Sequence, residues 1–231
     1  MNMNNLDFNP LKYVYPQRCA QCSDFCDDAL CEKCLKKLKR LTSYTCVKCG
    51  KPLGQCVCKD INAEFERCIS AFGFEDPCVA SLIYKLKSEG TKINADFLGN
   101  AISERIQNDY SEIAFDYVTY VPVTRRQYNE NGFDHAEIIA KFISKQLQIP
   151  LLKSPIYKRG GIKQKYLNVQ KRRKNAPKMF RIKRKTRVLG RILLVDDVMT
   201  TGNTFSVCAK LLKSAGASEI YCASVATSIK N

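Results

Sequence analysis

No apolar run in the sequence approaches the roughly 18 or more residues that a membrane-spanning helix requires. The start, residues 1–14, also lacks a basic stretch leading into an apolar segment, so no secretory signal is expected. These two absences make the cytoplasm, including the inner face of the membrane, the expected location. Thiols stay reduced in that compartment, so the cysteines of this chain are not expected to form disulfides.

Acidic residues are missing from one long stretch of the chain. Residues 153–191 contain sixteen Lys and Arg but no Asp or Glu, which equals the whole net charge of +16. Residues 61–152, by contrast, hold nine bases and thirteen acids. A basic block of this kind attracts phosphates, either in nucleic acid or in anionic lipid, and a solvated loop is the alternative.

The cysteines are concentrated near the N-terminus. Nine of the thirteen lie between Cys19 and Cys58, in a segment with few apolar residues. A segment this small cannot build a hydrophobic core, and bound metal is the stabilising element that a reducing compartment allows. The other four are expected to be small buried apolar side chains: Cys68, Cys78, Cys208 and Cys222.

The spacing within the cluster is typical of zinc knuckles, because a CxxC pair lets two thiolates reach one ion and four thiolates close a tetrahedral shell. Four pairs occur, the last with one intervening residue, and they predict two structural zinc sites. The candidate ligands are Cys19, Cys22, Cys31 and Cys34 for one ion and Cys46, Cys49, Cys56 and Cys58 for the other. A single zinc ion, an interleaved pairing, and a substitution by Cys26 stay open.

The change from a cysteine-rich segment to the hydrophobic patterning of a globular domain predicts two parts, a zinc module over residues 1–62 and an α/β domain over residues 63–231. Hydrophobic periodicity in the second part predicts strands at 69–74, 117–121, 191–195 and 220–225. It predicts helices at 80–87 and 95–107, one opening at Asp134 and running through Leu147, and a last one that stops at Gly216. Strands separated by helices imply a parallel, doubly wound sheet.

Two adjacent acids, Asp196 and Asp197, follow the apolar strand at 191–195. Both carboxylates are expected where the strand ends, because burying an unpaired carboxylate is costly, and there they can accept hydrogen bonds from two ribose hydroxyls. The next segment is rich in hydroxyls, contains Gly202, and opens a helix whose free N–H groups and dipole favour a phosphate. An Asp-rich turn before a capped helix and a metal site are the alternatives.

This segment resembles the 5-phosphoribosyl-1-pyrophosphate (PRPP) signature of type I phosphoribosyltransferases. The resemblance implies that Asp196 and Asp197 bind the ribose hydroxyls, that residues 200–204 surround the 5′-phosphate, and that Mg²⁺ accompanies the PRPP. The PRPP-binding residues that it implies are Asp196, Asp197, Val198, Met199, Thr200, Thr201, Gly202, Asn203 and Thr204, with Val123 and Thr124 at the turn for the pyrophosphate.

Further segments resemble the ComF family of competence proteins, which implies a type I phosphoribosyltransferase fold behind a zinc module. Asn131-Gly132-Phe133-Asp134-His135-Ala136 is similar to an Arg-Gly-Phe-Asn-Gln-Ala segment of that family, with Asn131, Asp134 and His135 as departures. The spacing of its mobile-loop signature is kept by Gln164, Leu167, Arg172 and Asn175, which implies a basic mobile loop over residues 153–191. His135 is expected to be a capping-turn residue rather than a catalyst, and no catalytic residue is assigned.

Aromatic residues interleave with the cations of the basic block, and such a surface can follow a phosphate backbone while its rings stack on unpaired bases. The candidate DNA-binding residues are Lys158, Arg159, Lys163, Lys165, Lys171, Arg172, Arg173 and Lys174. The favoured function is that of a ComF-like competence protein that handles single-stranded DNA in natural transformation, with other DNA-uptake proteins as partners. A metabolic phosphoribosyltransferase acting on a nucleobase or an amine, and a non-catalytic PRPP-binding scaffold, are the alternatives.

Overall fold

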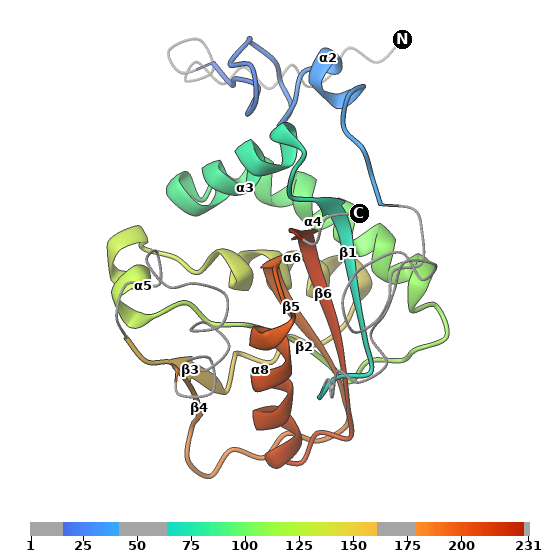
Figure 1. Ribbon diagram of the computed structural model, residues 1–231, viewed down its shortest axis with the longest axis vertical. Helices are drawn as coiled ribbons and strands as arrows, with labels where there is room; N and C mark the ends of the chain where they lie inside the picture. Colours follow the sequence, from blue (N-terminus) through green and yellow to red (C-terminus); the bar gives the residue numbers. More distant parts are fainter. Residues whose placement is uncertain (1–15, 42–63, 161–178, 229–231) are drawn as a thin grey trace, which may run out of the picture.

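A four-stranded parallel sheet with the strand order β1-β6-β5-β2 forms the centre of the protein (Figure 1). The computed structural model describes residues 16–41, 64–160 and 179–228. The strands are β1 (Arg67–Gly73), β6 (Glu219–Thr227), β5 (Arg191–Met199) and β2 (Tyr117–Tyr120). All four predicted strands are therefore confirmed, and β5 and β6 are longer than expected.

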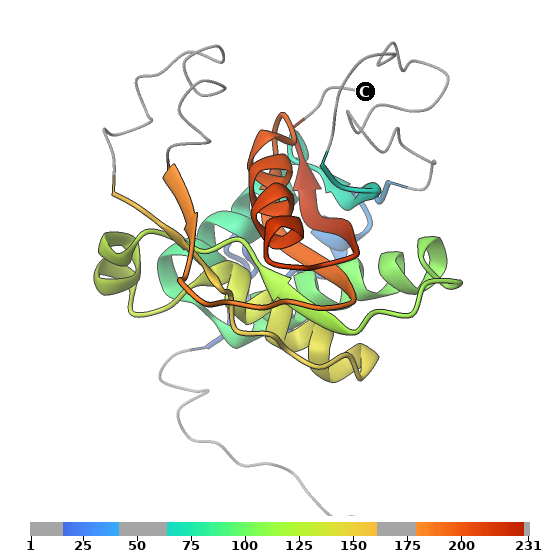
Figure 2. The same ribbon diagram turned by 90° about the horizontal axis from the view of Figure 1, so that it is seen from below.

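Helices cover both faces of this sheet (Figure 2). One face carries α3 (Pro77–Glu89), α4 (Lys92–Asp109) and α6 (His135–Leu147), and the other carries α8 (Asn203–Ser214). Successive residues of β5 point to opposite faces, so Leu193 joins the first hydrophobic cluster and Leu194 the second. Burial on both faces explains why the central strands are almost continuously apolar, and the predicted doubly wound architecture is confirmed.

The termini of α3 follow from local sequence. The Asp76 carboxylate accepts a hydrogen bond from the backbone N–H of Cys78 at 2.9 Å, and Pro77 occupies the first turn, where its missing N–H is not needed. The helix ends at Gly90, which adopts a left-handed conformation with φ of 62°. The predicted end at Gly90 is therefore confirmed, and the helix begins three residues before the predicted start at 80.

A short antiparallel hairpin, β3 (Ile156–Lys158) and β4 (Phe180–Ile182), lies outside the main sheet. An isolated parallel bridge between Thr124 and Lys158 places it beside the turn that follows β2. The hairpin strands carry the ends of the segment 161–178, so the middle of the basic block starts next to that turn.

The described part of the cysteine module, which contains α2 (Glu32–Leu35), packs on α3 (Figure 1). Ala29 and Leu30 are 1% and 3% exposed and belong to the same hydrophobic cluster as Val79 and Ile83 of α3. The module and the α/β domain therefore share one core at this junction.

The four cysteines outside the module are all buried, as predicted: Cys68, Cys78, Cys208 and Cys222. Burial raises the pKa of each of these thiols, which keeps them protonated and unreactive. Among the helices of the described residues, none combines the length and the apolar character that crossing a membrane would need.

Gly90 and Gly132 provide a matched test of the junction between α3 and α6. Both have positive φ, 62° and 79°, but a Cβ at Gly90 would lie 2.7 Å from the Phe133 ring, whereas a Cβ at Gly132 would meet nothing within 4 Å. A left-handed residue with a side chain costs about 1–2 kcal/mol. We expect Gly132→Ala to lower the free energy of unfolding by that amount and Gly90→Ala by more, because the ring must also move. Urea unfolding measures both, and equal losses would contradict the expected clash.

Candidate functional site

The two adjacent acids lie inside β5 and not at its end. Beyond Val195 the strand continues to pair with β6, with Asp196 opposite Ser224 and Met199 opposite Thr227. The expectation that both carboxylates sit where the strand ends is therefore wrong. One oxygen of each carboxylate is satisfied locally, because Oδ1 of Asp196 accepts the Asp197 N–H at 2.9 Å and Oδ1 of Asp197 accepts the Val198 N–H at 2.8 Å. Local hydrogen bonds of this kind let a strand carry two carboxylates without leaving the sheet.

The acids nevertheless lie in a position suited to ligand binding, because β2 is shorter than β5. The pairing of β2 with β5 ends at Tyr120 and Val195, so the segment of β5 that carries the acids extends beyond its neighbour. The helices that follow these two strands, α6 and α8, cover opposite faces of the sheet. Adjacent parallel strands whose following helices cover opposite faces form a topological switch point, which is where open α/β sheets bind ligands.

Asp197 is buried, with 6% of its surface exposed, yet a lysine and a histidine lie against its carboxylate. Its Oδ2 atom forms an ion pair with Lys87 of α3, and Nε2 of His135 in α6 lies 3.6 Å away. Burial on its own raises the pKa of this carboxyl, but the charges of Lys87 and His135 outweigh it and lower the pKa below its usual range. Asp197 is therefore an ionised hydrogen-bond acceptor.

Asp196 differs from its neighbour in the direction of its pKa shift. Burial and the negative charge of Asp197 raise the pKa of Asp196 well above its usual range, although the side chain is only part-buried by surface area. Within such a pair, one carboxyl keeps its proton more readily than the other. An ionised carboxylate accepts hydrogen bonds and a protonated one can also donate, which matches two neighbouring hydroxyls that can do both.

The loop after β5 leads directly into the start of α8. Thr200 and Thr201 are exposed, and Gly202 is left-handed with φ of 71°. The first backbone bond of α8 runs from the Ser206 N–H to the Gly202 carbonyl at 2.9 Å, and no side chain of the described residues caps the helix. The N–H groups of residues 203–205 thus have no helical partner and face the same edge as the acids, an arrangement that favours an anion.

Met199 occupies a different place from the rest of the predicted PRPP-binding segment. Its side chain is buried in the second hydrophobic cluster, where the Cys68 thiol lies 3.2 Å from its sulfur. Val198 is partly buried against the first cluster, and Asn203 and Thr204 are partly exposed at the start of α8. Only the backbone of Met199 is therefore available to a ligand.

The turn after β2 is closed by internal hydrogen bonds. Oδ2 of Asp134 accepts the Val123 N–H at 2.9 Å, and Oδ1 of Asp134 caps α6 by accepting the N–H groups of Ala136 and Glu137. Thr124 begins α5 (Arg125–Asn131) with a reciprocal capping box to Gln127. The departure from the family pattern at Asp134 thus has a structural role, since one carboxylate ties the turn to α6.

Two cations at this site were not identified from the sequence. Lys87 reaches Asp197 from a helix far away in the chain, and no feature of its local sequence marks it out. Arg125 opens α5 beside the turn and has no ion-pair partner among the described residues, whereas Arg126 pairs with Glu130 at 2.6 Å. The two successive arginines after Val123 and Thr124, in an otherwise acidic stretch, were a signal that could have located Arg125.

The basic hairpin adjoins the same site. Lys158 is bridged to Thr124, and its Nζ lies 5.4 Å from the centre of the Phe180 ring. Its charge adds to the lowering of the His135 pKa and offsets a small part of the rise in the Asp196 pKa. Arg159 and Tyr157 are exposed on this hairpin. The other predicted DNA-binding residues lie outside the described residues: Lys163, Lys165, Lys171, Arg172, Arg173 and Lys174.

The first predicted zinc site is assembled in the structure. It consists of four cysteines whose sulfur atoms all lie within 4.8 Å of one another: Cys19, Cys22, Cys31 and Cys34. The sulfurs of Cys22 and Cys31 are 3.6 Å apart. Zinc–sulfur bonds of about 2.3 Å in a tetrahedron would separate the sulfurs by roughly 3.8 Å, so the cluster fits this ion. The Cys26 thiol instead donates to the Asp28 carbonyl at 3.1 Å, and Cys26 is not part of the cluster.

Thiolate character within the cluster is strongest at Cys19. Although burial raises its pKa, the backbone N–H groups of Cys22 and Cys31 lower the pKa of the Cys19 thiol to about 6. Thiolates are the form that binds metal, so the backbone favours the state that the ion needs. The second set of predicted ligands lies outside the described residues: Cys46, Cys49, Cys56 and Cys58.

Comparison with known proteins identifies two domain types along the chain. Residues 10–68 match the double zinc ribbon domain, and residues 134–230 match the phosphoribosyl transferase domain. The first match contains all eight predicted zinc ligands, and the second contains the two acids, the loop and α8. These are the two domain types that the sequence resemblance implied.

Several named relatives cover most of the chain. Competence protein ComFC of Bacillus subtilis (strain 168) is 25% identical over 201 residues, which are 82% of this chain and 80% of that protein. The DNA utilization protein YhgH of Escherichia coli O157:H7 is 25% identical over 207 residues, 84% of this chain and 88% of its own. A solved adenine phosphoribosyltransferase from Thermoanaerobacter pseudethanolicus aligns over 85% of this chain and 98% of its own, at 14% identity and a TM-score of 0.39.

The single histidine of the chain reports on this site without overlap from other histidines. Burial lowers the pKa of His135, the charge of Asp197 raises it, and Lys87 lowers it further, with a net lowering. We therefore expect an imidazole titration midpoint below the usual value of about 6.5. Lys87→Met should raise this midpoint and Asp197→Asn should lower it, because each removes one of the two opposing charges.

NMR of the imidazole C–H groups against pH measures these midpoints. Lys145→Met, at the far end of α6, serves as the control and should leave the midpoint unchanged. A shift of both variants in the same direction would contradict the proposed arrangement of charges.

Proposed function

We propose that this chain is a ComF-like competence protein that binds PRPP and handles single-stranded DNA in natural transformation, as its match to a double zinc ribbon and a phosphoribosyl transferase domain and its similarity to competence protein ComFC support. The observation that carries the PRPP site is the ionised Asp197, with Asp196 beside it, at the switch point between β5 and β2. Asp196 and Asp197 bind the 2′- and 3′-hydroxyls of the ribose. The loop at 200–204 and the start of α8 hold the 5′-phosphate.

Pyrophosphate binds on the β2 side of the crevice. The turn with Val123 and Thr124 lies there, and Arg125 supplies an exposed positive charge next to it. The N–H groups of Val123 and Thr124 donate to Asp134 and Gln127 in this structure, so we assign the principal contact to the Arg125 guanidinium. Mg²⁺ accompanies the pyrophosphate and keeps part of its water shell, as this ion usually does.

DNA binding is supported by the position of the basic block. The hairpin that carries Lys158 and Arg159 adjoins the turn after β2, and exposed Tyr157 offers a ring on which a base can stack. A single strand exposes the faces of its bases as well as its phosphates, whereas a duplex exposes its phosphates but keeps its base faces stacked inside. Interleaved aromatic and basic residues therefore fit a single strand better. We infer a cytoplasmic protein that meets incoming single strands next to its PRPP site.

The cysteine module contributes structure in this proposal and no chemistry. Four thiolates around zinc leave no open coordination position, so the ion holds the fold and does not activate a substrate. We assign one zinc ion to the cluster that contains Cys19 and a second to the four cysteines between Cys46 and Cys58.

PRPP binding is tested by calorimetry in the presence of Mg²⁺. We expect Asp196→Asn/Asp197→Asn to weaken binding by more than a hundredfold without unfolding the protein, because two hydrogen bonds to charged or acidic groups are lost at about 1.5–3 kcal/mol each. Asp197→Asn alone should account for the larger share, since Asp197 is the ionised member of the pair. Asp96→Asn on α4 makes the same chemical change away from the site and should bind like the unmodified chain.

Equal affinities in the double variant and the unmodified chain would refute the assigned site. Pyrophosphate release with a nucleobase or an amine as acceptor would assign a transferase activity. Binding without release would favour a regulatory role for PRPP.

Single-stranded DNA binding should depend steeply on salt and weakly on base sequence. If about five phosphates are neutralised, the logarithm of the affinity should fall against the logarithm of the salt concentration with a slope of roughly −3.5. Lys171→Ala/Arg172→Ala/Arg173→Ala/Lys174→Ala should flatten that slope and weaken binding, which fluorescence anisotropy with an oligonucleotide measures.

A four-charge control removes lysines from the cysteine module instead: Lys33, Lys36, Lys37 and Lys39. The slope should be unchanged in this variant. A flattened slope here, with no change in the first variant, would move the DNA contact from the basic block to the module.

A further inference from the structure

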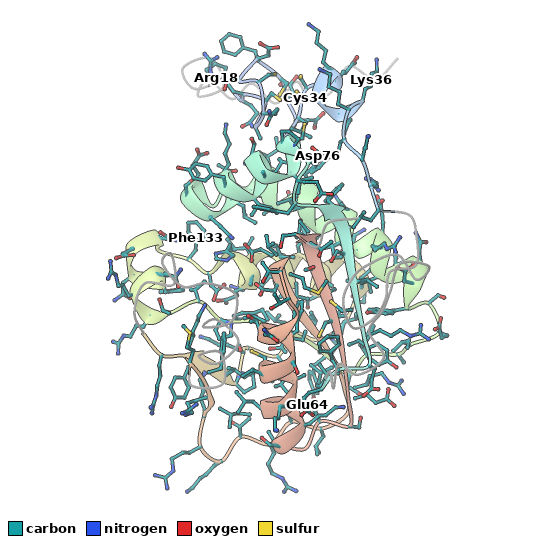
Figure 3. The ribbon with its side chains drawn as sticks, viewed as in Figure 1. Arg18, Cys34, Lys36, Glu64, Asp76 and Phe133 are labelled. Atoms are coloured by element: carbon teal, nitrogen blue, oxygen red, sulfur yellow. The ribbon has the colours of Figure 1, made fainter. Side chains whose placement is uncertain are left out.

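Helix α3 makes contact with the cysteine module at its amino end. The Lys39 N–H donates to Oδ2 of Asp76 at 3.2 Å, and the Cys78 thiol donates to the carbonyl of Cys34 at 3.7 Å. One turn later, the hydroxyl of Ser81 donates to Gln21 at 2.6 Å. Figure 3 shows Cys34 of the module facing Asp76 at the start of this helix. The amino end of α3 is therefore held by the loops that carry the zinc ligands.

The other end of the same helix reaches the ribose-phosphate site. Lys87 in the last turn forms the ion pair with buried Asp197. At about 1.5 Å per residue, roughly 16 Å of helix separate Asp76 from Lys87. One helix thus touches a zinc ligand segment at one end and the acidic pair of the α/β domain at the other.

Between these ends, α3 is built to move as a single body. Val79, Leu82, Ile83 and Leu86 are each 0–1% exposed and form one buried stripe. No glycine interrupts the helix, and its one proline stands in the first turn, so the usual causes of a kink are absent from its interior. The helix therefore links the module to Lys87 through one continuous, unkinked element.

The ion pair with Lys87 leaves some of the hydrogen-bond acceptor sites of the Asp197 carboxylate free. A carboxylate has about four lone-pair sites. Lys87 occupies Oδ2, and the Val198 N–H occupies one site on Oδ1. Sites remain for a ribose hydroxyl, while the ammonium group keeps the buried carboxyl ionised.

We propose that α3 couples zinc binding to PRPP binding: the four-cysteine zinc site fixes the amino end of the helix, which holds Lys87 against Asp197. Lys87 is a positioning residue in this scheme, because it acts on PRPP through the carboxylate. The inference rests on the proposed PRPP site. Because linkage is reciprocal, PRPP must then raise the affinity for zinc by the same factor that zinc raises the affinity for PRPP.

The first arm of the test measures PRPP affinity by calorimetry with Mg²⁺ present, before and after zinc is removed from the full chain with a chelator selective for zinc. Couplings of this type amount to about 5–150-fold. We expect a loss in that range for the unmodified chain. Lys87→Met should bind PRPP more weakly with zinc present, and zinc removal should change its affinity less than about twofold.

Two control variants lie on the same helix. Lys85→Met removes an equal charge two residues from Lys87, at a position with no ion pair among the described residues, and should keep the full zinc effect. Ser81→Ala removes one contact with the module and should reduce the effect. Ser88→Ala removes only bonds inside the helix, to the carbonyls of Tyr84 and Lys85, and should not reduce the effect.

The second arm does not depend on PRPP. The NMR signal of His135, which lies 3.6 Å from Asp197, should shift on zinc removal in the unmodified chain and stay in place in Lys87→Met. A shift without any PRPP binding would uphold the coupling of zinc to Asp197 while the proposed PRPP site failed.

Either of two results overturns the coupling. One is an unchanged His135 signal together with an unchanged PRPP affinity after zinc removal. The other is tighter PRPP binding by Lys87→Met, which would mean that Lys87 competes with the ribose for Asp197.

Discussion

The buried carboxylate of Asp197 is the constraint on which the site depends. A carboxylate with so little exposed surface stays ionised only if a cation lies close to it, and here Lys87 supplies that charge from a distant helix, with the His135 imidazole 3.6 Å away on another. Lys87 reaches Asp197 because it lies in the last turn of α3. His135 reaches it because α6 begins at this residue, directly after its N-cap Asp134. The packing of these helices on one face of the sheet is therefore also the electrostatic support of the site.

Sheet topology converts this charged centre into a binding crevice. Because β5 extends beyond β2, and the helices after these strands lie on opposite faces, the acids lie at a topological switch point, with the start of α8 and the turn after β2 following the two strands. The first offers unpaired N–H groups and the second offers Arg125. Ribose, phosphate and pyrophosphate thus each have a chemically matching neighbour along one edge of the sheet.

The two accessory parts of the chain are attached close to this edge. The basic hairpin is bridged to the turn at Thr124, so cations suited to DNA lie beside a site suited to PRPP. The cysteine module shares a hydrophobic core with α3, the helix that supplies Lys87. Both accessory parts therefore contact the elements that surround the acidic pair.

The sequence by itself determined whatever depends on neighbouring residues. CxxC spacing predicted the cluster of Cys19, Cys22, Cys31 and Cys34, and apolar runs predicted the strands. The acids before a hydroxyl-rich loop marked the segment that lies within the phosphoribosyl transferase match. Only the tertiary structure decided that β5 continues through Asp196 and Asp197, because pairing with β6 holds that segment in the sheet. It also decided the opposite pKa shifts of the two acids, since Lys87 reaches Asp197 only in the folded chain. Electrostatic interactions act through space, and no spacing along the chain specifies them.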